Sequence, residues 1–356
     1  MRRERVLITG GAGFIGAHTA LALVEGGYRV RVLDSLHPQV HGPGRRWPSY
    51  LCAEAERLRG DVLCLDDLRE ALDGADWVFH FCSETGVGQS MEEVSRYYAV
   101  NVQGTANLFH SIRQVRRKPR GVLLSSSRAI YGEGRRWCPR CRKTFFPGMR
   151  SVDDLRHGRW EVRCPGCRAG SLPRGSRETD PPRPCSTYAI TKWQQEEMVR
   201  FYCGWLGIPW VVLRYFNVYG PWQSPQNPYT GIVVLFMRLA RAAKQIDIFE
   251  DGRPARDFVY VEDVVQANLA ALARMRHGCG TYNVGSGEVT TIAGLADAID
   301  RVLGTRTPRL RAGHFREGDI RTCLPDLREN RRTLGYRPST LLERGLRQLL
   351  EWFRSR

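Results

Sequence analysis

The sequence lacks any run of 18 apolar residues, the length that a membrane-spanning helix requires. Its basic N-terminus continues into a short strand pattern and a cluster of glycines, and not into the apolar core of a secretion signal. Lysine is also scarce. Of the 54 basic residues only four are lysines, namely Lys118, Lys143, Lys192 and Lys244. The absence of a membrane-spanning run and of a secretion signal leads us to expect a cytoplasmic protein with no membrane partner.

The net charge of +17 is carried mainly by arginine. Apart from local groups such as residues 113–120, the arginines are spread along the chain and form no single basic tract. A clustered basic surface would favour the binding of nucleic acid, whereas dispersed charge indicates only non-specific association. We therefore expect no nucleic-acid partner. The planar guanidinium group also suits an anionic small substrate, because it matches the geometry of phosphate.

The eleven cysteines do not indicate a disulfide framework, because their number is odd and no secretory context accompanies them. Four of them form two Cys-x-x-Cys pairs separated by 22 residues, namely Cys138, Cys141, Cys164 and Cys167. This spacing is typical of a zinc ribbon, in which four thiolates hold one structural ion. We predict structural zinc, with a redox pair or a chance spacing as the alternatives.

Short apolar runs alternate with helical patterns over much of the chain. The runs lie at residues 6–9, 28–33, 77–81, 121–125 and 210–214, and the helical patterns at 17–25, 95–113 and 187–205. This alternation predicts an α/β fold with a doubly wound parallel sheet. The pattern breaks between Tyr131 and Glu178, where cysteine, proline, glycine and arginine predominate. We interpret that stretch as an insertion.

A glycine-rich turn follows the first predicted strand and contains Gly10, Gly13 and Gly16. This spacing allows a tight turn, a close approach of the backbone to a pyrophosphate, and close packing of the following helix. Asp34 ends the next strand, where its carboxylate would accept hydrogen bonds from ribose hydroxyls and repel a 2′-phosphate. The combination predicts a Rossmann domain that binds NAD in preference to NADP. A glycine turn without a cofactor is the alternative.

Tyr188 and Lys192 are four residues apart, and therefore lie on one face of a predicted helix. They follow a strand that ends in three serines, of which Ser127 is the last. A nearby ammonium group and a bound nicotinamide cation would favour the phenolate form of Tyr188. The pair therefore predicts a base that removes a proton from a hydroxyl group.

Together these motifs resemble the extended short-chain dehydrogenase/reductase family, specifically its nucleotide-sugar epimerases and dehydratases. The resemblance covers nearly the whole chain. Further segments that carry it are residues 60–62, 80–83, 100–105, 214–221, 251–252, 256–264, 282–285 and 316–319.

The resemblance implies a role for individual residues. Tyr188 would be the base, Lys192 would bind the nicotinamide ribose and tune Tyr188, and Ser127 would bond the reacting sugar hydroxyl. Cofactor contacts are implied for Gly10, Gly13, Phe14, Ile15, Gly16, Asp34, Asp61, Val62, Phe81, Ser83, Asn101, Tyr188 and Lys192. On the substrate side, Asn217 would contact the sugar diphosphate, and Arg256 and Arg316 would contact its pyrophosphate, for which guanidinium offers paired hydrogen bonds.

We expect an NAD-binding Rossmann domain at residues 1–217, with the zinc-ribbon-like insertion at 135–177, and a substrate-binding domain at 218–356. The resemblance also implies a homodimer. Its interface would involve the helices around residues 97–112 and 187–204.

One departure from the family's eliminating branches concerns the reaction. Two residues after Ser127, where dehydratases and related decarboxylases carry an acid, this chain has Ala129. Alanine has no proton to exchange, which favours 4-epimerisation through a transient 4-keto sugar. The insertion and residues 227–232 resemble the branch that converts dTDP-L-rhamnose to dTDP-6-deoxy-L-talose, which we expect as the reaction. The alternatives are a related epimerase, dehydratase or decarboxylase acting on a UDP- or GDP-sugar, and a nucleic-acid-binding ribbon protein with an NAD-sensing domain.

Overall fold

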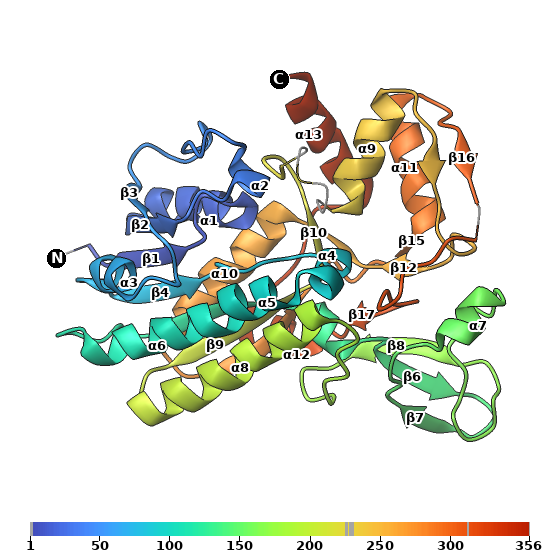
Figure 1. Cartoon of the computed structure of the whole chain (residues 1–356), viewed down its shortest axis with the longest axis horizontal. Coiled ribbons are helices and arrows are strands. Elements are labelled where there is room, and N and C mark those ends of the chain that lie inside the picture. The colour runs from blue at the N-terminus through green and yellow to red at the C-terminus, as the bar shows by residue number, and fades with distance from the viewer. Residues whose placement is uncertain (1–2, 225–226, 228–230, 312, 356) are drawn as a thin grey trace.

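The computed structural model describes residues 3–224, 227, 231–311 and 313–355 (Figure 1). Its centre is a seven-stranded sheet in which all neighbouring strands run parallel. The strand order is β14 (Gly280–Val284), β9 (Trp210–Tyr215), β5 (Val122–Ser127), β4 (Trp77–His80), β1 (Arg5–Thr9), β2 (Arg29–Asp34) and β3 (Glu56–Arg59). The order reverses between β1 and β4, and α/β sheets of this kind bind ligands at the carboxyl ends of the strands beside such a reversal.

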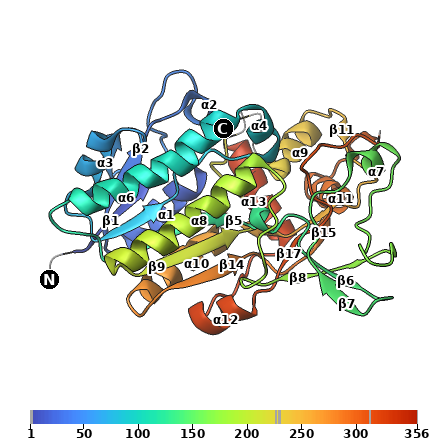
Figure 2. The ribbon, with the colours of Figure 1, turned by 60° about the horizontal axis from the view of Figure 1, so that its bottom comes forward.

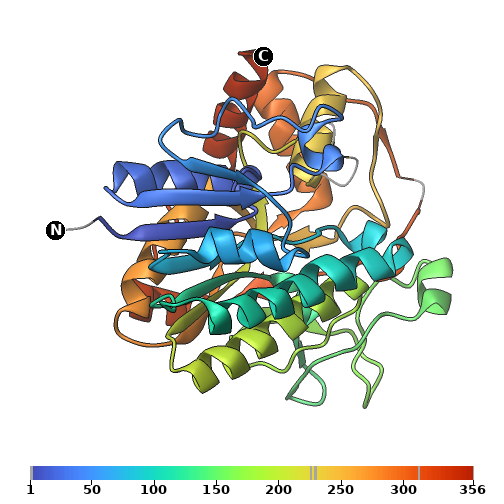
Figure 3. The ribbon, with the colours of Figure 1, turned by 60° about the vertical axis from the view of Figure 1, so that its left-hand side comes forward.

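Helices cover both faces of this sheet (Figure 3). On one face lie α1 (Phe14–Glu25) and α10 (Val261–Met275), and on the other lie α3 (Leu65–Leu72), α6 (Gly104–Gln114) and α8 (Thr187–Leu206). Successive residues of a strand point to opposite faces of the sheet. Ile8 packs in the core beneath α1 and α10, whereas Leu7 packs beneath α3, α6 and α8. The prediction of a doubly wound α/β sheet is confirmed.

The sheet does not end at residue 217, where the sequence suggested a domain boundary. Strand β14 pairs with β9 along its whole length, and α10 packs against α1. Both elements lie in the segment that we had assigned to the substrate domain. The division of the chain is therefore discontinuous, because a parallel edge strand is placed by its partner and not by its neighbours in sequence.

The smaller unit is built on three helices, α9 (Ile232–Arg241), α11 (Ile292–Leu303) and α13 (Leu342–Arg354), which share a second apolar core (Figures 1 and 2). Three two-stranded sheets accompany them. They pair β10 (Asn217–Tyr219) with β13 (Phe258–Tyr260), β11 (Ile246–Asp247) with β16 (Arg309–Leu310), and β12 (Ala255–Arg256) with β15 (Thr290–Thr291). Because β10 follows β9 after one residue, this unit begins at the carboxyl edge of the large sheet.

The predicted insertion forms a separate lobe beside the two units (Figure 1). It contains β6 (Arg135–Cys138), β7 (Lys143–Phe145), α7 (Val152–Arg156) and β8 (Leu172–Ser176). These strands form a four-stranded sheet with β17 (Leu324–Pro325), in the order β17-β8-β6-β7. The insertion is thus joined to the C-terminal part of the chain through backbone pairing.

The remaining elements are short connections. They are α2 (Pro38–His41), α4 (Val87–Glu92), α5 (Val94–Tyr97), the π-helix η1 (Tyr98–Gln103), the 3-10 helix η2 (Arg128–Tyr131) and α12 (Arg328–Leu334). Within the described residues, no helix combines the length and apolar character needed to cross a bilayer.

Candidate active site

The glycine turn between β1 and α1 has the shape that a pyrophosphate requires. Gly10 has a φ of +70°, and a Cβ there would lie 2.8 Å from the backbone nitrogen of Cys82. A Cβ on Gly16 would lie 2.5 Å from the carbonyl oxygen of Gly10. Gly13 precedes α1, and no side chain caps the first turn. The helix N-terminus around Phe14 and Ile15 is therefore open to an anion, which fits the phosphates of NAD.

Asp34 lies at the end of β2, next to this turn. Its carboxylate accepts hydrogen bonds from the backbone nitrogens of Ala12 (3.0 Å) and Leu36 (2.9 Å). The Nε2 atom of His41 lies 3.6 Å from the Oδ1 atom of Asp34. Burial raises the pKa of Asp34, and the charge of His41 opposes that rise. The carboxylate is thus held at the place where an adenosine ribose would be expected in a Rossmann domain.

Four further predicted cofactor residues follow β3 and β4 at the same edge of the sheet. Asp61 accepts from the backbone nitrogen of Leu63, and the buried Val62 side chain packs so closely that a Cβ on Gly104 would lie 2.6 Å from it. The other two residues, Phe81 and Ser83, follow β4, where Phe81 donates its backbone N–H to the carbonyl of Thr9.

Ser127 and Tyr188 come together from different elements. Ser127 is the last residue of β5, and Tyr188 lies in the first turn of α8, which begins after Ser186 caps it. The Ser127 hydroxyl lies close enough to the Tyr188 phenol to lower its pKa. The hydroxyl oxygen of Ser127 also accepts from the backbone nitrogen of Ala129 at 3.1 Å, which fixes its orientation. The fold therefore brings the two residues of the predicted pair together.

The protonation of Tyr188 is set by opposing effects. Burial raises the pKa of its phenol, and the Ser127 hydrogen bond and the positive charge of Arg128 lower that pKa. Tyr97 meets Tyr188 edge to face, with ring centroids 6.4 Å apart. This contact limits where the phenol can lie.

Lys192 lies one helical turn after Tyr188 and is almost completely buried. Its ammonium donates to Gln195 (2.8 Å) and Ser83 (3.3 Å). Gln195 in turn donates to Thr105 at 2.8 Å, so that the ammonium belongs to a chain of buried hydrogen bonds. Burial lowers the pKa of Lys192 to about 7. The group can therefore lose its charge near neutral pH, with the cation favoured below that value.

Asn101 connects two segments of the site. It lies in the π-helix η1, a type of irregularity that occurs often at functional sites. Its side chain accepts from the backbone nitrogen of Glu84 (2.7 Å) and donates to Thr191 (3.0 Å). It thereby connects the loop after β4 to α8. In the structure Asn101 positions the neighbours of Lys192, whereas the sequence had suggested only a cofactor contact.

Arg128 was not predicted as a site residue. It follows Ser127 directly, and its Nε donates to the side-chain oxygen of Asn217 at 2.9 Å. Burial lowers the pKa of its guanidinium to about 10, and the nearby charge of Arg256 acts in the same direction. No carboxylate of the described chain lies within salt-bridge distance of it. The feature of the sequence that could have identified Arg128 as a site residue is its position directly after a serine at the end of a central strand.

The predicted substrate residues come from three segments of the chain. Asn217 and Arg256 lie on β10 and β12, beside Arg128. Arg256 pairs with Asp319 at 2.8 Å and donates to the carbonyl of Ile320. Arg316 is exposed, its guanidinium lies 4.8 Å from the ring centroid of Phe249, and its carbonyl accepts from the backbone nitrogen of Asp319. Of the predicted segment 227–232, residues 228–230 lie outside the described part.

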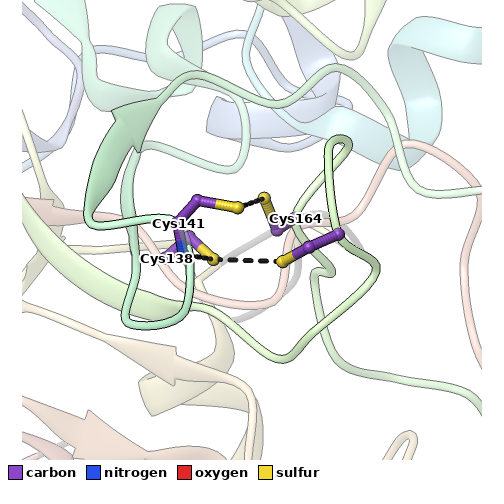
Figure 4. A group of neighbouring side chains, drawn as sticks. Cys138, Cys141 and Cys164 are labelled. Carbon is purple, nitrogen blue, oxygen red and sulfur yellow. Dashed lines mark hydrogen bonds between the residues drawn. The ribbon is translucent and has the colours of Figure 1, made fainter.

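The four predicted metal ligands also come together, in the insertion (Figure 4). The sulfur atoms of Cys138, Cys141, Cys164 and Cys167 all lie within 4.8 Å of one another. Two sulfur pairs are closer: Cys138 and Cys167 are 3.5 Å apart, and Cys141 and Cys164 are 3.9 Å apart. A tetrahedral ion with zinc–sulfur bonds of about 2.3 Å places its ligands about 3.8 Å apart, so the cluster fits zinc. The separations are too long for disulfides.

The family model "NAD dependent epimerase/dehydratase family" matches residues 6–147 and 166–285. The chain belongs to this family. The unmatched residues between the two segments lie in the cysteine-bearing insertion. The matches confirm the prediction of an NAD-dependent nucleotide-sugar epimerase of the extended short-chain type.

Among curated proteins, the chain is 39% identical to a dTDP-L-rhamnose 4-epimerase from Burkholderia thailandensis, over 98% of this chain and 94% of the relative. Among solved structures, it is similar to a UDP-glucose 4-epimerase with UDP-glucose from Thermotoga maritima, with a TM-score of 0.78, 29% identity and 99% of each chain covered. A Thermus thermophilus UDP-glucose 4-epimerase in complex with NAD also has a TM-score of 0.78, with 28% identity and coverage of 98% of this chain and 99% of that one.

Proposed function

We propose that this enzyme inverts C4 of dTDP-L-rhamnose, giving dTDP-6-deoxy-L-talose through a transient 4-keto sugar. The observation that carries the proposal is the approach of Ser127 to Tyr188, with Lys192 one turn away and Ala129 where an eliminating enzyme has an acid. The substrate is suggested by the similarity to the Burkholderia thailandensis protein.

In the proposed reaction, Tyr188 as phenolate takes the proton of the sugar hydroxyl and later returns it. Ser127 bonds the same hydroxyl and orients it toward the phenolate. Lys192 supports the phenolate by its charge and binds the nicotinamide ribose. Bound NAD+ would supply the ability to accept a hydride from carbon and to return it. Holding these groups in line is worth on the order of 7–11 kcal/mol of the barrier.

The charged groups around the site suit a nucleoside diphosphate. Arg128 is partly buried and bonded to Asn217, and it faces no carboxylate within salt-bridge distance among the described residues. A cation withdrawn from water in this way is stabilised when an anion neutralises it. We assign that role to the substrate diphosphate, with Asn217, Arg256 and Arg316 as its other contacts.

The site would hold NAD through the groups described above. Gly10, Gly13 and Gly16 would accept the pyrophosphate, with Phe14 and Ile15 in the first turn of the helix. The other contacts would come from Asp34, Asp61, Val62, Phe81, Ser83, Asn101, Tyr188 and Lys192. The four insertion cysteines would hold one structural zinc ion, which has no part in the exchange of the hydride.

The reaction is tested by running it in deuterium oxide and examining the sugar by proton NMR and mass spectrometry. Oxidation and re-reduction at one carbon keep the migrating hydrogen away from solvent, so the product should carry no carbon-bound deuterium. Dehydration, or inversion by enolisation next to a keto group, removes a carbon-bound proton and would introduce label. Stoichiometric deuterium on carbon contradicts the mechanism.

Two further results separate the substrate from the mechanism. Inertness toward dTDP-L-rhamnose with unlabelled turnover of a UDP-hexose would overturn only the substrate. Replacing Tyr188 with Phe removes the acid–base group and keeps the ring, and should lower turnover about 10²–10⁴-fold. Unchanged turnover in the Tyr188→Phe enzyme would show that the base is another group.

A further inference from the structure

A buried network of charged side chains joins the cysteine-bearing insertion to the C-terminal part of the chain. Glu133, two residues before β6, is 1% exposed. Its carboxylate accepts from the backbone nitrogen of Arg321 at 2.9 Å and lies 2.7 Å from Nε of Arg150. Arg136 on β6 also bonds it, at 3.2 Å. The insertion therefore contacts the segment around residue 321 through charges that are shielded from water.

Arg150 of the insertion makes contacts in three directions. Its guanidinium donates to Glu250 (2.7 Å), to the carbonyl of Asp319 (3.1 Å) and to the carbonyl of Trp160 (3.2 Å). Its side chain is only 6% exposed. A planar guanidinium with five donors can satisfy such a set, whereas a lysine ammonium cannot reach all of these acceptors at once.

The same segment holds Arg256. The carboxylate of Asp319 binds Arg256 at 2.8 Å, and the carbonyls of Ile320 and Arg321 accept from the same guanidinium at 2.8 and 3.1 Å. Arg321 is itself fixed by Glu250 and by Asp251, at 2.9 and 2.6 Å. Arg256 is thus surrounded by groups whose positions depend on Arg150 and Glu133.

We propose that the insertion is a positioning element for the substrate's diphosphate, and that Arg150 is the positioning residue that fixes Asp319 and, through it, Arg256. The proposal rests on the proposed function, because it uses Arg256 as a diphosphate contact. It gives the insertion a role in substrate affinity, separate from the transfer of hydride. The zinc ion would act one step further away, by ordering the loops that present Arg150.

The proposal is tested with Arg150→Gln and Arg150→Lys, measured as KM and kcat for the nucleotide sugar and as the Kd of dTDP by calorimetry. We expect Arg150→Gln to raise KM and the Kd of dTDP on the order of tenfold and to leave kcat within about twofold, because a 1.4 kcal/mol loss corresponds to a factor of ten. Arg150→Lys keeps the charge and should recover part of the affinity. Arg159→Gln is the matched control in the same lobe, since the side chain of Arg159 bonds only the exposed Asp153 and the partly exposed Asp154 among the described contacts.

A double-mutant cycle with Arg256→Gln shows whether Arg150 influences the binding of dTDP through Arg256. If it does, the enzyme with both substitutions binds dTDP about as weakly as Arg256→Gln alone. Additive losses would overturn the proposal, as would an unchanged Kd in a folded Arg150→Gln enzyme or a fall in kcat without a rise in KM. An unchanged Kd in Arg256→Gln would instead contradict the proposed function.

Glu161→Gln serves if Arg150→Gln does not fold. Glu161 lies in the insertion, is 57% exposed and bonds the guanidinium of Arg321. Its substitution should raise the Kd of dTDP in the same direction by a smaller factor, with the melting temperature little changed. No change in the Kd for this folded variant would count against a link between the insertion and the diphosphate site.

Discussion

At the scale of single residues, the proposed base Tyr188 is governed by two near neighbours. Burial raises the pKa of its phenol, and the hydrogen bond of Ser127 is the largest of the effects that lower it, followed by the charge of Arg128. Both neighbours stabilise the phenolate. The tyrosine is in its active, deprotonated form above its pKa, so each neighbour extends activity toward lower pH.

This argument predicts the pH profile of Ser127→Ala. Removing the hydroxyl takes away a hydrogen bond to the phenolate, and the pKa of Tyr188 should rise. The acidic limb of kcat/KM should therefore move to higher pH, with activity recovering as pH increases. Ser125→Ala is the control, because Ser125 lies on the same strand and its hydroxyl donates to the carbonyl of His80. An acidic limb at the same pH in both variants would contradict the role given to Ser127.

Residues whose roles depend on burial and on distant partners were the least visible in the sequence. Tyr188 and Lys192 were predicted because their spacing places both on one helical face, and this property is local. Arg128 follows Ser127 directly and Gln195 lies three residues after Lys192, but neither carries a motif of its own. Their importance comes from burial and from partners far away in the chain, such as Asn217 and Thr105.

At the scale of elements, the strands that the sequence predicted are those flanked by helices in a regular alternation. Strands β1, β5 and β9 begin and end within two residues of the predicted runs. The sequence did not predict strand β14, because residues of the smaller unit interrupt the alternation of strands and helices before it. Its pairing with β9 completes the sheet. Strand β17 consists of two residues, and only its pairing with β8 defines it.

The insertion is the element for which a metal is proposed, and its prediction concerns composition and stability. Enzyme purified without chelator should contain about one zinc per chain, because closed sites with four thiolates bind tightly. Cys164→Ser should lose the metal and lower the melting temperature. Cys279→Ser, which changes an exposed cysteine outside the cluster, should affect neither. The metal is measured by elemental analysis, and less than about half a zinc per chain in the unsubstituted enzyme would refute the site.

At the scale of the whole molecule, exposed apolar side chains gather on neighbouring helices of one face. Helices α4, α5, η1 and α8 carry six of them, namely Met91, Val94, Tyr98, Trp193, Phe201 and Trp205. Phe201 is 67% exposed and Trp205 is 58% exposed. Helix α8 lies beside α4, α5 and α6 in Figure 1. An exposed apolar patch of this kind is typical of a surface that another chain covers.

We expect this face to join two copies of the chain, since the family resemblance places a dimer interface on the same helices. A cyclic dimer buries the same patch on both chains, so one substitution weakens the interface twice. Phe201→Glu adds a charge to each side and should convert a dimer into a monomer at micromolar concentration, as measured by light scattering. Leu341→Glu is the control, because Leu341 is 63% exposed and caps α13, a helix that lies away from α8 in Figure 1. A monomer in the unsubstituted enzyme, or a dimer that survives Phe201→Glu and dissociates with Leu341→Glu, would place the interface elsewhere. The residues that we assign to the reaction site all come from one chain, so we expect the monomeric variant to retain NAD and its turnover per site, which an assay of the same samples would measure.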